Sequence, residues 1–165
     1  MSFLDSADDP KRAARRPLLF FILATLAVGA GASVFSEPNI PIWYASLNRP
    51  FFAPPGWLLA WLWTGLYLLM AVAAWRTWKV TGLKSTAMAL YALQLAFTFV
   101  WTALFFGHHQ MGPALTALGL LALLRLATNI LFWRANRLAG LLFLPCLGWA
   151  WFEAVLVYAF QALNP

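Results

Sequence analysis

The sequence is poor in charge, in acidic residues and in cysteine. Of its 165 residues, 10% are charged, five are Asp or Glu and one is Cys, whereas about a quarter of the residues of a soluble domain are charged. A single cysteine cannot form an internal disulfide, which excludes the disulfide-stabilised secreted class. The 63% hydrophobic content excludes an intrinsically disordered chain. A soluble domain of this size cannot bury that much apolar surface, so we expect the excess to face lipid.

The sequence also lacks the motifs of common soluble enzymes. It contains no dinucleotide fingerprint, no phosphate-binding glycine loop, no metal-ligand cluster and no nucleophile paired with a base. The net charge of +6 does not indicate nucleic acid, because most of the basic residues lie beside or between apolar runs. In that position they favour contacts with lipid headgroups and a role in membrane topology.

Five apolar stretches are each long enough to cross a bilayer as a helix, which takes about 20 residues. They cover residues 17–36, 57–78, 87–107, 113–133 and 138–163. Lipid leaves open backbone groups unsatisfied, so such spans are helical. The sequence therefore predicts an all-α integral membrane protein, a bundle of five transmembrane helices in residues 17–165. A basic tail, residues 1–16, precedes it. The small residues Ala30–Ser33 after the first apolar run also fit a signal-peptide cleavage site, but the length of the run favours a retained helix.

Basic residues alternate between the two ends of these spans. Those on one side are Lys11, Arg12, Arg15 and Arg16, then Arg76, Lys79 and Lys84, then Arg134 and Arg137. The other side carries Arg49 alone. The positive-inside rule therefore predicts a cytoplasmic N-terminus and an outer C-terminus. Helical spans with basic inner loops favour a bacterial inner membrane, with an outer membrane as the alternative.

The connection 37–56 carries five of the ten prolines together with Trp43, Tyr44, Phe51 and Phe52. Proline fixes its own φ and restricts the preceding residue, so this segment should be stiff. Two interpretations remain open, a lid above the bundle or a hydrophobic cap resting on the membrane surface.

Polar and aromatic residues recur at helical spacing inside the spans. The sets that share a helix face are Gln94, Thr98, Trp101 and Phe105, then Trp63 and Tyr67, then Trp149 and Glu153. Aromatic faces with a few polar groups suit a flat conjugated ligand. The same stripes also fit simple packing between helices.

Two charges fall inside the spans, Arg125 in the fourth and Glu153 in the fifth. An unpaired charge at the bilayer centre costs at least about 2.5 kcal/mol. The two spans run antiparallel and place both residues at similar depth, so we expect Arg125 and Glu153 to interact, with a protonated Glu153 as the alternative. Such a pair either holds two helices together or takes part in ligand binding or proton coupling. The lone Cys146 is expected to be a small apolar filler.

Three segments together resemble the signature of the translocator protein family, also called the tryptophan-rich sensory proteins or TspO/MBR family. They are Trp43-Tyr44-Ala45-Ser46-Leu47-Asn48-Arg49-Pro50, Pro54-Pro55-Gly56-Trp57 and Trp63-Thr64-Gly65-Leu66-Tyr67. Tyr91, Gln94, Trp101, Pro145 and Trp149 extend the resemblance at consistent spacing. Thr98, Cys146 and Val157 depart from the residues that are usual in the family, and Glu153 replaces a small residue.

The resemblance implies a five-helix membrane receptor or sensor, often a homodimer, that acts in tetrapyrrole regulation or stress responses. Its ligands would be porphyrins or haem, with sterols and synthetic benzodiazepine or isoquinoline compounds as further ligands, and it would need no cofactor or metal. Carried over by position, and with Glu153 added, the ligand-binding residues would be Tyr44, Trp63, Tyr67, Gln94, Thr98, Trp101, Phe105, Trp149 and Glu153. No basic residue follows Leu156 and Tyr158, so the weak cholesterol-recognition pattern is broken and tetrapyrrole ranks above sterol.

Two other activities are compatible with the resemblance. One is light- and oxygen-dependent porphyrin breakdown, for which Trp63 and Trp149 would be the reactive residues. The other is transport of these ligands by a small carrier, favoured only by the charges of Arg125 and Glu153.

Overall fold

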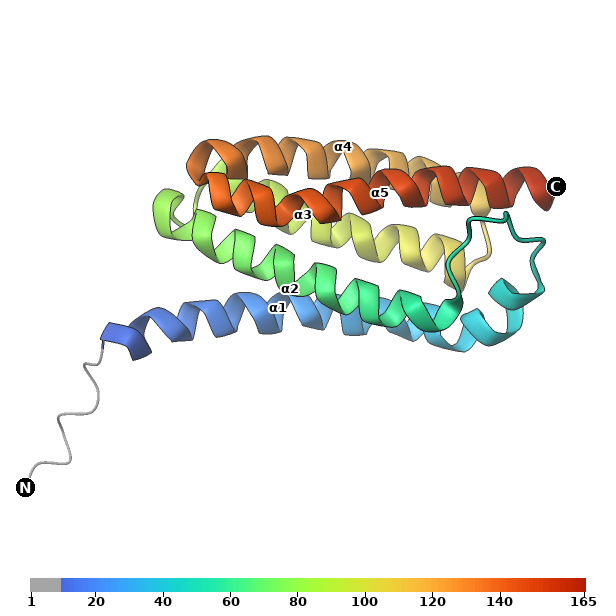
Figure 1. The fold of residues 1–165 in the computed structure, drawn as a ribbon, viewed down its shortest axis with the longest axis horizontal. Coiled ribbons are helices and arrows are strands. Elements are labelled where there is room, and N and C mark those ends of the chain that lie inside the picture. Colours follow the sequence, from blue (N-terminus) through green and yellow to red (C-terminus); the bar gives the residue numbers. More distant parts are fainter. Residues whose placement is uncertain (1–9) are drawn as a thin grey trace, which may run out of the picture.

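The five predicted helices are present and form a single bundle in a computed structural model (Figure 1). The structure describes the backbone from Pro10 to Pro165 and the side chains from Arg16 onward. Of the predicted tail, residues 1–16, the first nine lie outside the described residues and 10–16 form the start of the first helix. The elements are α1 (Pro10–Asn39), η1 (Ile40–Tyr44), α2 (Gly56–Thr81), α3 (Thr86–Thr102), η2 (Ala103–Gly107), α4 (Met111–Ala135) and α5 (Arg137–Leu163). All five helices are long and apolar enough to cross a membrane, which confirms the all-α, five-span prediction.

The first helix extends further than the sequence indicated. Helical backbone continues through the π-helix η1 as far as Ser46, so only residues 47–55 of the predicted loop 37–56 are irregular. Pro38 and Pro41 lie within this helical stretch. A proline lacks the N–H that an α-helix requires, and at membrane depth a local shift to π geometry satisfies the backbone groups that it frees. The prediction from proline content therefore ended this helix too early.

Two short connections, α2–α3 and α4–α5, lie at the end of the bundle opposite η1. The helix that follows each of them has a capped N-terminus. The Ser85 side chain accepts a hydrogen bond from the Met88 N–H at 3.4 Å, and the Asn136 side chain accepts one from the Ala139 N–H at 3.0 Å. Each oxygen satisfies a backbone donor that the first turn of a helix leaves unpaired. Gly82, after α2, has φ +74°, a conformation that favours glycine. These caps allow α2 and α3, and α4 and α5, to run antiparallel with few intervening residues.

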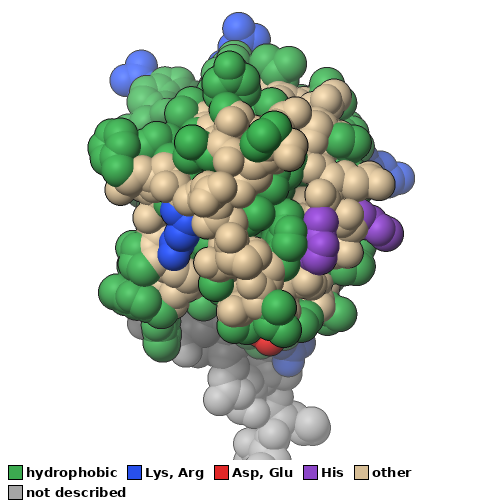
Figure 2. Space-filling model, turned by 90° about the vertical axis from the view of Figure 1, so that its right-hand side faces the viewer, with side chains coloured by type: hydrophobic (Ala, Val, Ile, Leu, Met, Phe, Trp, Pro, Cys, Tyr) green, Lys and Arg blue, Asp and Glu red, His purple; other side chains and the backbone are tan. Residues whose placement is uncertain are grey.

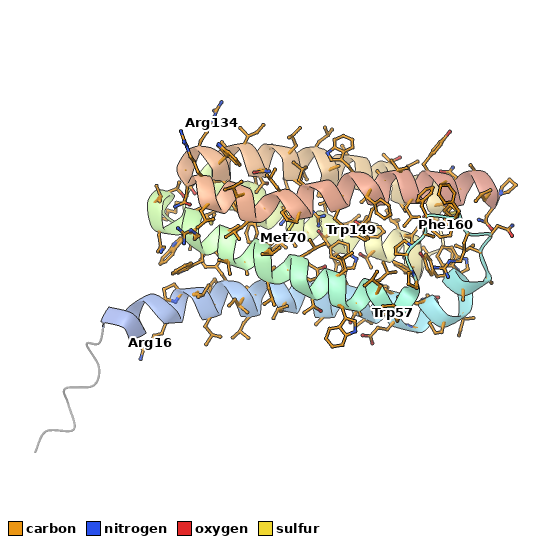
Figure 3. The ribbon with its side chains drawn as sticks, viewed as in Figure 1. Arg16, Trp57, Met70, Arg134, Trp149 and Phe160 are labelled. Atoms are coloured by element: carbon orange, nitrogen blue, oxygen red, sulfur yellow. The ribbon has the colours of Figure 1, made fainter. Side chains whose placement is uncertain are left out.

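Basic side chains gather at this end of the bundle. Arg16 and Arg134 both lie there (Figure 3), together with the α2–α3 and α4–α5 connections (Figure 1). At the other end hydrophobic and uncharged surface dominates, with the histidine side chains at its edge (Figure 2). Along the sides large apolar residues are exposed, among them Leu23, Trp57, Trp61, Val155 and Tyr158. An apolar belt with one basic end is the surface of a protein that spans a bilayer.

Helices α4 and α5 approach closely at Gly140. A Cβ atom added to Gly140 would lie 2.6 Å from Trp133 Cε3 and 2.8 Å from the Trp133 Cα atom. The backbone of α4 cannot yield as a side-chain tip can. Small residues at such crossings let membrane helices pack closely, and van der Waals contact then contributes to their association.

Replacing Gly140 with Ala should therefore destabilise the bundle, by about 1–3 kcal/mol for an overpacked contact. Gly148 is the matched control in the same helix, because a Cβ there meets nothing within 4 Å. Gly148→Ala should leave stability unchanged or raise it through helix propensity. Thermal unfolding of both variants in detergent measures the difference, and an unchanged midpoint for Gly140→Ala would refute the close approach.

Candidate functional site

A cavity of about 400 Å³ lies between α1, α2 and the α3–η2 helix. Its aromatic lining comes from Trp63 and Tyr67 of α2 and from Trp101 and Phe106 on the third span. The remaining lining residues are Leu26, Gly29, Ala30, Ala32, Ser33, Ser36, Glu37, Ile40, Leu59, Ala60, Thr64 and Thr102. The volume falls within the range of about 300–1,000 Å³ typical of small-molecule sites.

Small residues on α1 create this space. Gly29, Ala30, Ala32 and Ser33 all face the cavity, and a Cβ at Gly29 would lie 2.5 Å from Tyr67 Cε2. In the structure this run of small residues therefore lines a cavity.

The cavity opens sideways between α1 and α2. Ala30 of α1 and Ala60 and Thr64 of α2 line it and are also exposed on the outer surface. That surface belongs to the apolar belt, so the opening faces the region that lipid would occupy. An apolar molecule dissolved in the bilayer would reach the aromatic lining without crossing water.

A second, much smaller cavity of about 30 Å³ lies deeper, between α2, α3–η2 and α5. It is lined by Tyr44, Leu59, Trp63, Trp101, Phe105, Phe106, Trp149, Glu153, Leu156, Val157 and Phe160. Leu59, Trp63, Trp101 and Phe106 line both cavities, and the rings of Trp63 and Trp101 lie 6.4 Å apart. The small cavity has room for a water molecule or a small substituent but not for a ring system.

Arg125 occupies the centre of the bundle and is fully buried. Its Nε donates to Gln94 Oε1 at 3.2 Å, its Nη2 donates to Thr98 Oγ1 at 3.2 Å, and its Nη1 donates to the Cys146 carbonyl at 3.3 Å. The guanidinium carbon also lies 5.5 Å from the centre of the Trp63 ring, close enough for a cation–π contact. One side chain of α4 thus connects α3, α5 and α2.

The predicted ion pair between Arg125 and Glu153 is wrong. The hydrogen bonds that the structure gives Arg125 go to α3 and to a backbone carbonyl, and Glu153 Oε2 is buried without a partner among the described residues. The two charges alone do not reveal the partners of Arg125. Gln94 and Thr98, four residues apart on α3, present two neutral acceptors to one guanidinium, whose donors form a planar fork.

The irregular segment 47–55 is fixed across the end of the bundle opposite the basic side chains. The Asn48 N–H donates to Asn164 Oδ1 at 2.9 Å and the Asn164 amide donates to the Asn48 carbonyl at 3.1 Å. The Phe52 ring lies 6.2 Å from that of Phe152, whereas Phe51 is fully exposed. The segment therefore contacts the bundle through one ring and leaves another exposed, and the choice between a lid and a membrane-surface cap stays a prediction.

The nine predicted ligand-binding residues separate into three groups. Trp63, Tyr67 and Trp101 line the large cavity, and Tyr44, Phe105, Trp149 and Glu153 join Trp63 and Trp101 around the small one. Gln94 and Thr98 hold Arg125. The α1 residues of the large cavity were missed. The only sequence signal for them is the run of small side chains, which carries no chemical group.

Comparison with known proteins agrees with this architecture. The model of the family described as TspO/MBR matches residues 21–163. Protein CrtK of Rhodobacter capsulatus is 35% identical over 88% of this chain and 91% of its own length. A tryptophan-rich sensory protein of Cereibacter sphaeroides is 38% identical over 87% of this chain and 90% of its own. The translocator protein of Sus scrofa is 40% identical over 70% and 71%.

Replacing Gln94 with Leu should destabilise the bundle, because the buried Arg125 Nε then loses its acceptor. A hydrogen bond to a charged group contributes about 1.5–3 kcal/mol, so a loss of about 2 kcal/mol is expected. Gln161→Leu, at an exposed position of α5, is the matched control and should have little effect. Equal unfolding midpoints for the two variants in detergent would contradict the role given to Arg125.

Proposed function

The chain belongs to the TspO/MBR family, and from that premise we propose that it is a membrane receptor for porphyrin-type tetrapyrroles or similarly flat apolar molecules. The ligand would occupy the 400 Å³ cavity between α1, α2 and α3. Relatives named as sensory and translocator proteins support a role in sensing such a ligand, with regulation of tetrapyrroles or a stress response as the outcome.

The observation that carries this proposal is the aromatic lining of a cavity that opens toward lipid. Trp63 and Tyr67, whose rings lie 5.3 Å apart at an interplanar angle of 32°, lie one helical turn apart on α2. Trp101 adds a third ring from α3. Flat conjugated molecules gain both apolar burial and favourable ring contacts against such surfaces. A ring system needs this volume, which the small cavity does not supply.

Several ligand classes share these requirements, and tetrapyrroles fit them best. Sterols are apolar but not aromatic, and the sequence lacks a basic residue after Leu156 and Tyr158. Synthetic benzodiazepine or isoquinoline compounds are flat and aromatic and would compete for the same space. A displacement assay with such compounds ranks the classes directly.

The position of one residue, Trp63, supports a second candidate function, light-dependent porphyrin breakdown. Trp63 lines both cavities and would touch a bound porphyrin, whereas Trp149 lines only the small one. Loss of porphyrin absorbance under illumination in air, absent in the dark and absent in Trp63→Phe, would establish this activity. Stable absorbance under illumination would exclude it.

The charge distribution supports an orientation. Arg16, Arg76, Lys79, Lys84, Arg134 and Arg137 lie at one end of the bundle and Arg49 at the other. We therefore place the N-terminus in the cytoplasm and the C-terminus outside, in a bacterial inner membrane. The family resemblance further suggests a homodimer.

Narrowing the cavity should weaken binding. Ala60→Phe places a ring at the opening between α1 and α2, and should weaken protoporphyrin binding at least about tenfold, equal to about 1.4 kcal/mol. Ala96→Phe adds the same ring to an exposed position of α3 and should bind as the unaltered protein does. Saturable quenching of tryptophan fluorescence in detergent gives both affinities. Equal weakening by both variants, or no saturable quenching at all, would refute the proposed site.

A further inference from the structure

Positive charge gathers at the basic end of the bundle, where the described residues supply no negative charge. The two described acidic residues lie elsewhere, Glu37 beside the large cavity and Glu153 in the interior, on α5. The cationic residues of the basic end are Arg16, Arg76, Lys79, Lys84, Arg134 and Arg137. A cluster of this kind beside a bilayer attracts anions, and the anions at hand are the headgroups of acidic lipids.

Two of these cations, Arg76 and Lys79 of α2, lie at the level of Trp75 and not at the helix end. The Lys79 Nζ atom lies 3.7 Å from the centre of the Trp75 ring, so the ammonium is directed away from the end of α2 at Thr81. A lysine near a membrane surface ordinarily extends toward water instead. Arg76 follows Trp75 in the chain, is half-buried, and has its Nε atom buried without a hydrogen-bond partner in the described part of the chain. At a rise of about 1.5 Å per residue, this level is roughly 8 Å inside the helix end.

Helix α5 adds a third cation at the same level. The Cys146 Sγ atom lies 3.5 Å from the Leu66 carbonyl oxygen, which sets the register between α5 and α2, two antiparallel helices that pack together. Nine residues from this contact toward the basic end, α5 has Arg137 and α2 has Trp75. Because both helices rise equally per residue, Arg137 lies about level with Trp75 and Arg76. The Arg137 side chain is exposed. Neighbouring helices thus contribute three cations at one depth.

The surroundings of these cations favour a lipid over a free anion in water. Val80 and Leu83, near the end of α2, are 61% and 64% exposed, and Leu138, near the start of α5, is 45% exposed. Acyl chains cover such apolar surface, whereas a dissolved anion would leave it bare. A phosphodiester offers acceptor oxygens to guanidinium and ammonium donors, and bonds between charged partners are the strong ones. One anionic phospholipid therefore matches both the charge and the apolar surface.

We propose that Arg76, Lys79 and Arg137 bind the headgroup of an anionic phospholipid, such as phosphatidylglycerol, at the basic end of α2 and α5. The two arginines donate to the phosphate oxygens, and Lys79, held on the Trp75 ring, supplies positive charge beside them. A choline headgroup carries its own cation, which these side chains repel, so the site selects lipids with a net negative charge. None of these residues lines the 400 Å³ cavity, and the inference does not depend on the proposed function.

Two lipids with identical acyl chains test the site. Phosphatidylglycerol and phosphatidylcholine share the phosphodiester and differ in the net charge of the headgroup. Native mass spectrometry of the full chain, titrated with each lipid in detergent, gives the dissociation constant of the first bound lipid. Phosphatidylglycerol should bind at least about tenfold more tightly, a ratio that corresponds to about 1.4 kcal/mol.

Charge-removing variants locate the site. Arg76→Gln should weaken the binding of phosphatidylglycerol about tenfold and leave that of phosphatidylcholine unchanged, because a charged donor to the phosphate is lost. Lys79→Gln should weaken it about threefold, since its ammonium acts beside the phosphate. Arg134→Gln is the matched control, because it removes one exposed positive charge from the same end of the bundle but from α4. It should change the affinity by less than about twofold.

Thermal unfolding separates lipid binding from an effect on folding. A lipid that binds the folded protein raises its unfolding midpoint. Phosphatidylglycerol should raise the midpoint of the unaltered protein and of Arg134→Gln more than phosphatidylcholine does, and should lose this advantage in Arg76→Gln. Each variant is compared with itself in the two lipids, so a lower stability of Arg76→Gln cannot imitate the loss of binding.

Three results would overturn the inference. Equal affinities for the two lipids would show that the cations do not select an anionic headgroup. Equal weakening by Arg76→Gln and Arg134→Gln would show a preference of the whole basic end and not of a site on α2 and α5. Displacement of phosphatidylglycerol by millimolar inorganic phosphate would show an anion site that does not require a lipid.

Discussion

The bundle depends on a single buried cation. Arg125 lies in the interior of a membrane protein, where an unsatisfied charge is costly, and it is satisfied by Gln94, Thr98 and the Cys146 carbonyl. These partners come from two different helices, and Trp63 of a third lies beside the guanidinium. Each partner reaches the guanidinium only when its helix lies at the matching height along the bundle. Arg125 therefore fixes the register of α2, α3, α4 and α5. Their aromatic side chains are thereby placed in a fixed arrangement.

Helix α1 takes no part in this network, and the cavity forms beside α1 for that reason. In the most apolar stretch of the first span 17% of the residues are buried, against 39–44% in the other four. Its polar connection to α3 is the hydrogen bond between Thr25 and Tyr91, closer to the basic end than the cavity is. Beyond that contact small residues of α1 line the cavity together with Trp63, and Gly29 lies directly against the Tyr67 ring. A rigid four-helix core with one loosely packed helix gives a site that apolar ligands can enter from the bilayer.

The sequence predicted most of the fold and part of the site. Length and hydropathy identified five spans because a segment in lipid must satisfy its backbone hydrogen bonds internally, as a helix does. Helical spacing correctly placed Trp63 with Tyr67 and Trp101 with Phe105. It did not predict that Gln94 and Thr98 would bind Arg125, since which helices face one another is a property of the bundle and not of one helix. The end of α1 was misplaced because Pro38 and Pro41 are tolerated in a widened helix. The large cavity exists because the side chains of α1 along it are small, and a run of small side chains is not a recognisable sequence motif.

If the protein is a receptor of this kind, a flat ligand occupies the space between α1, α2 and α3. A structure of the protein with protoporphyrin bound, in a lipid environment, would show where the ligand lies. We expect the macrocycle between α1 and α2, in contact with Trp63, Tyr67 and Trp101. Density for the ligand on the exposed indoles of Trp57 or Trp61, with the cavity empty or closed, would contradict it.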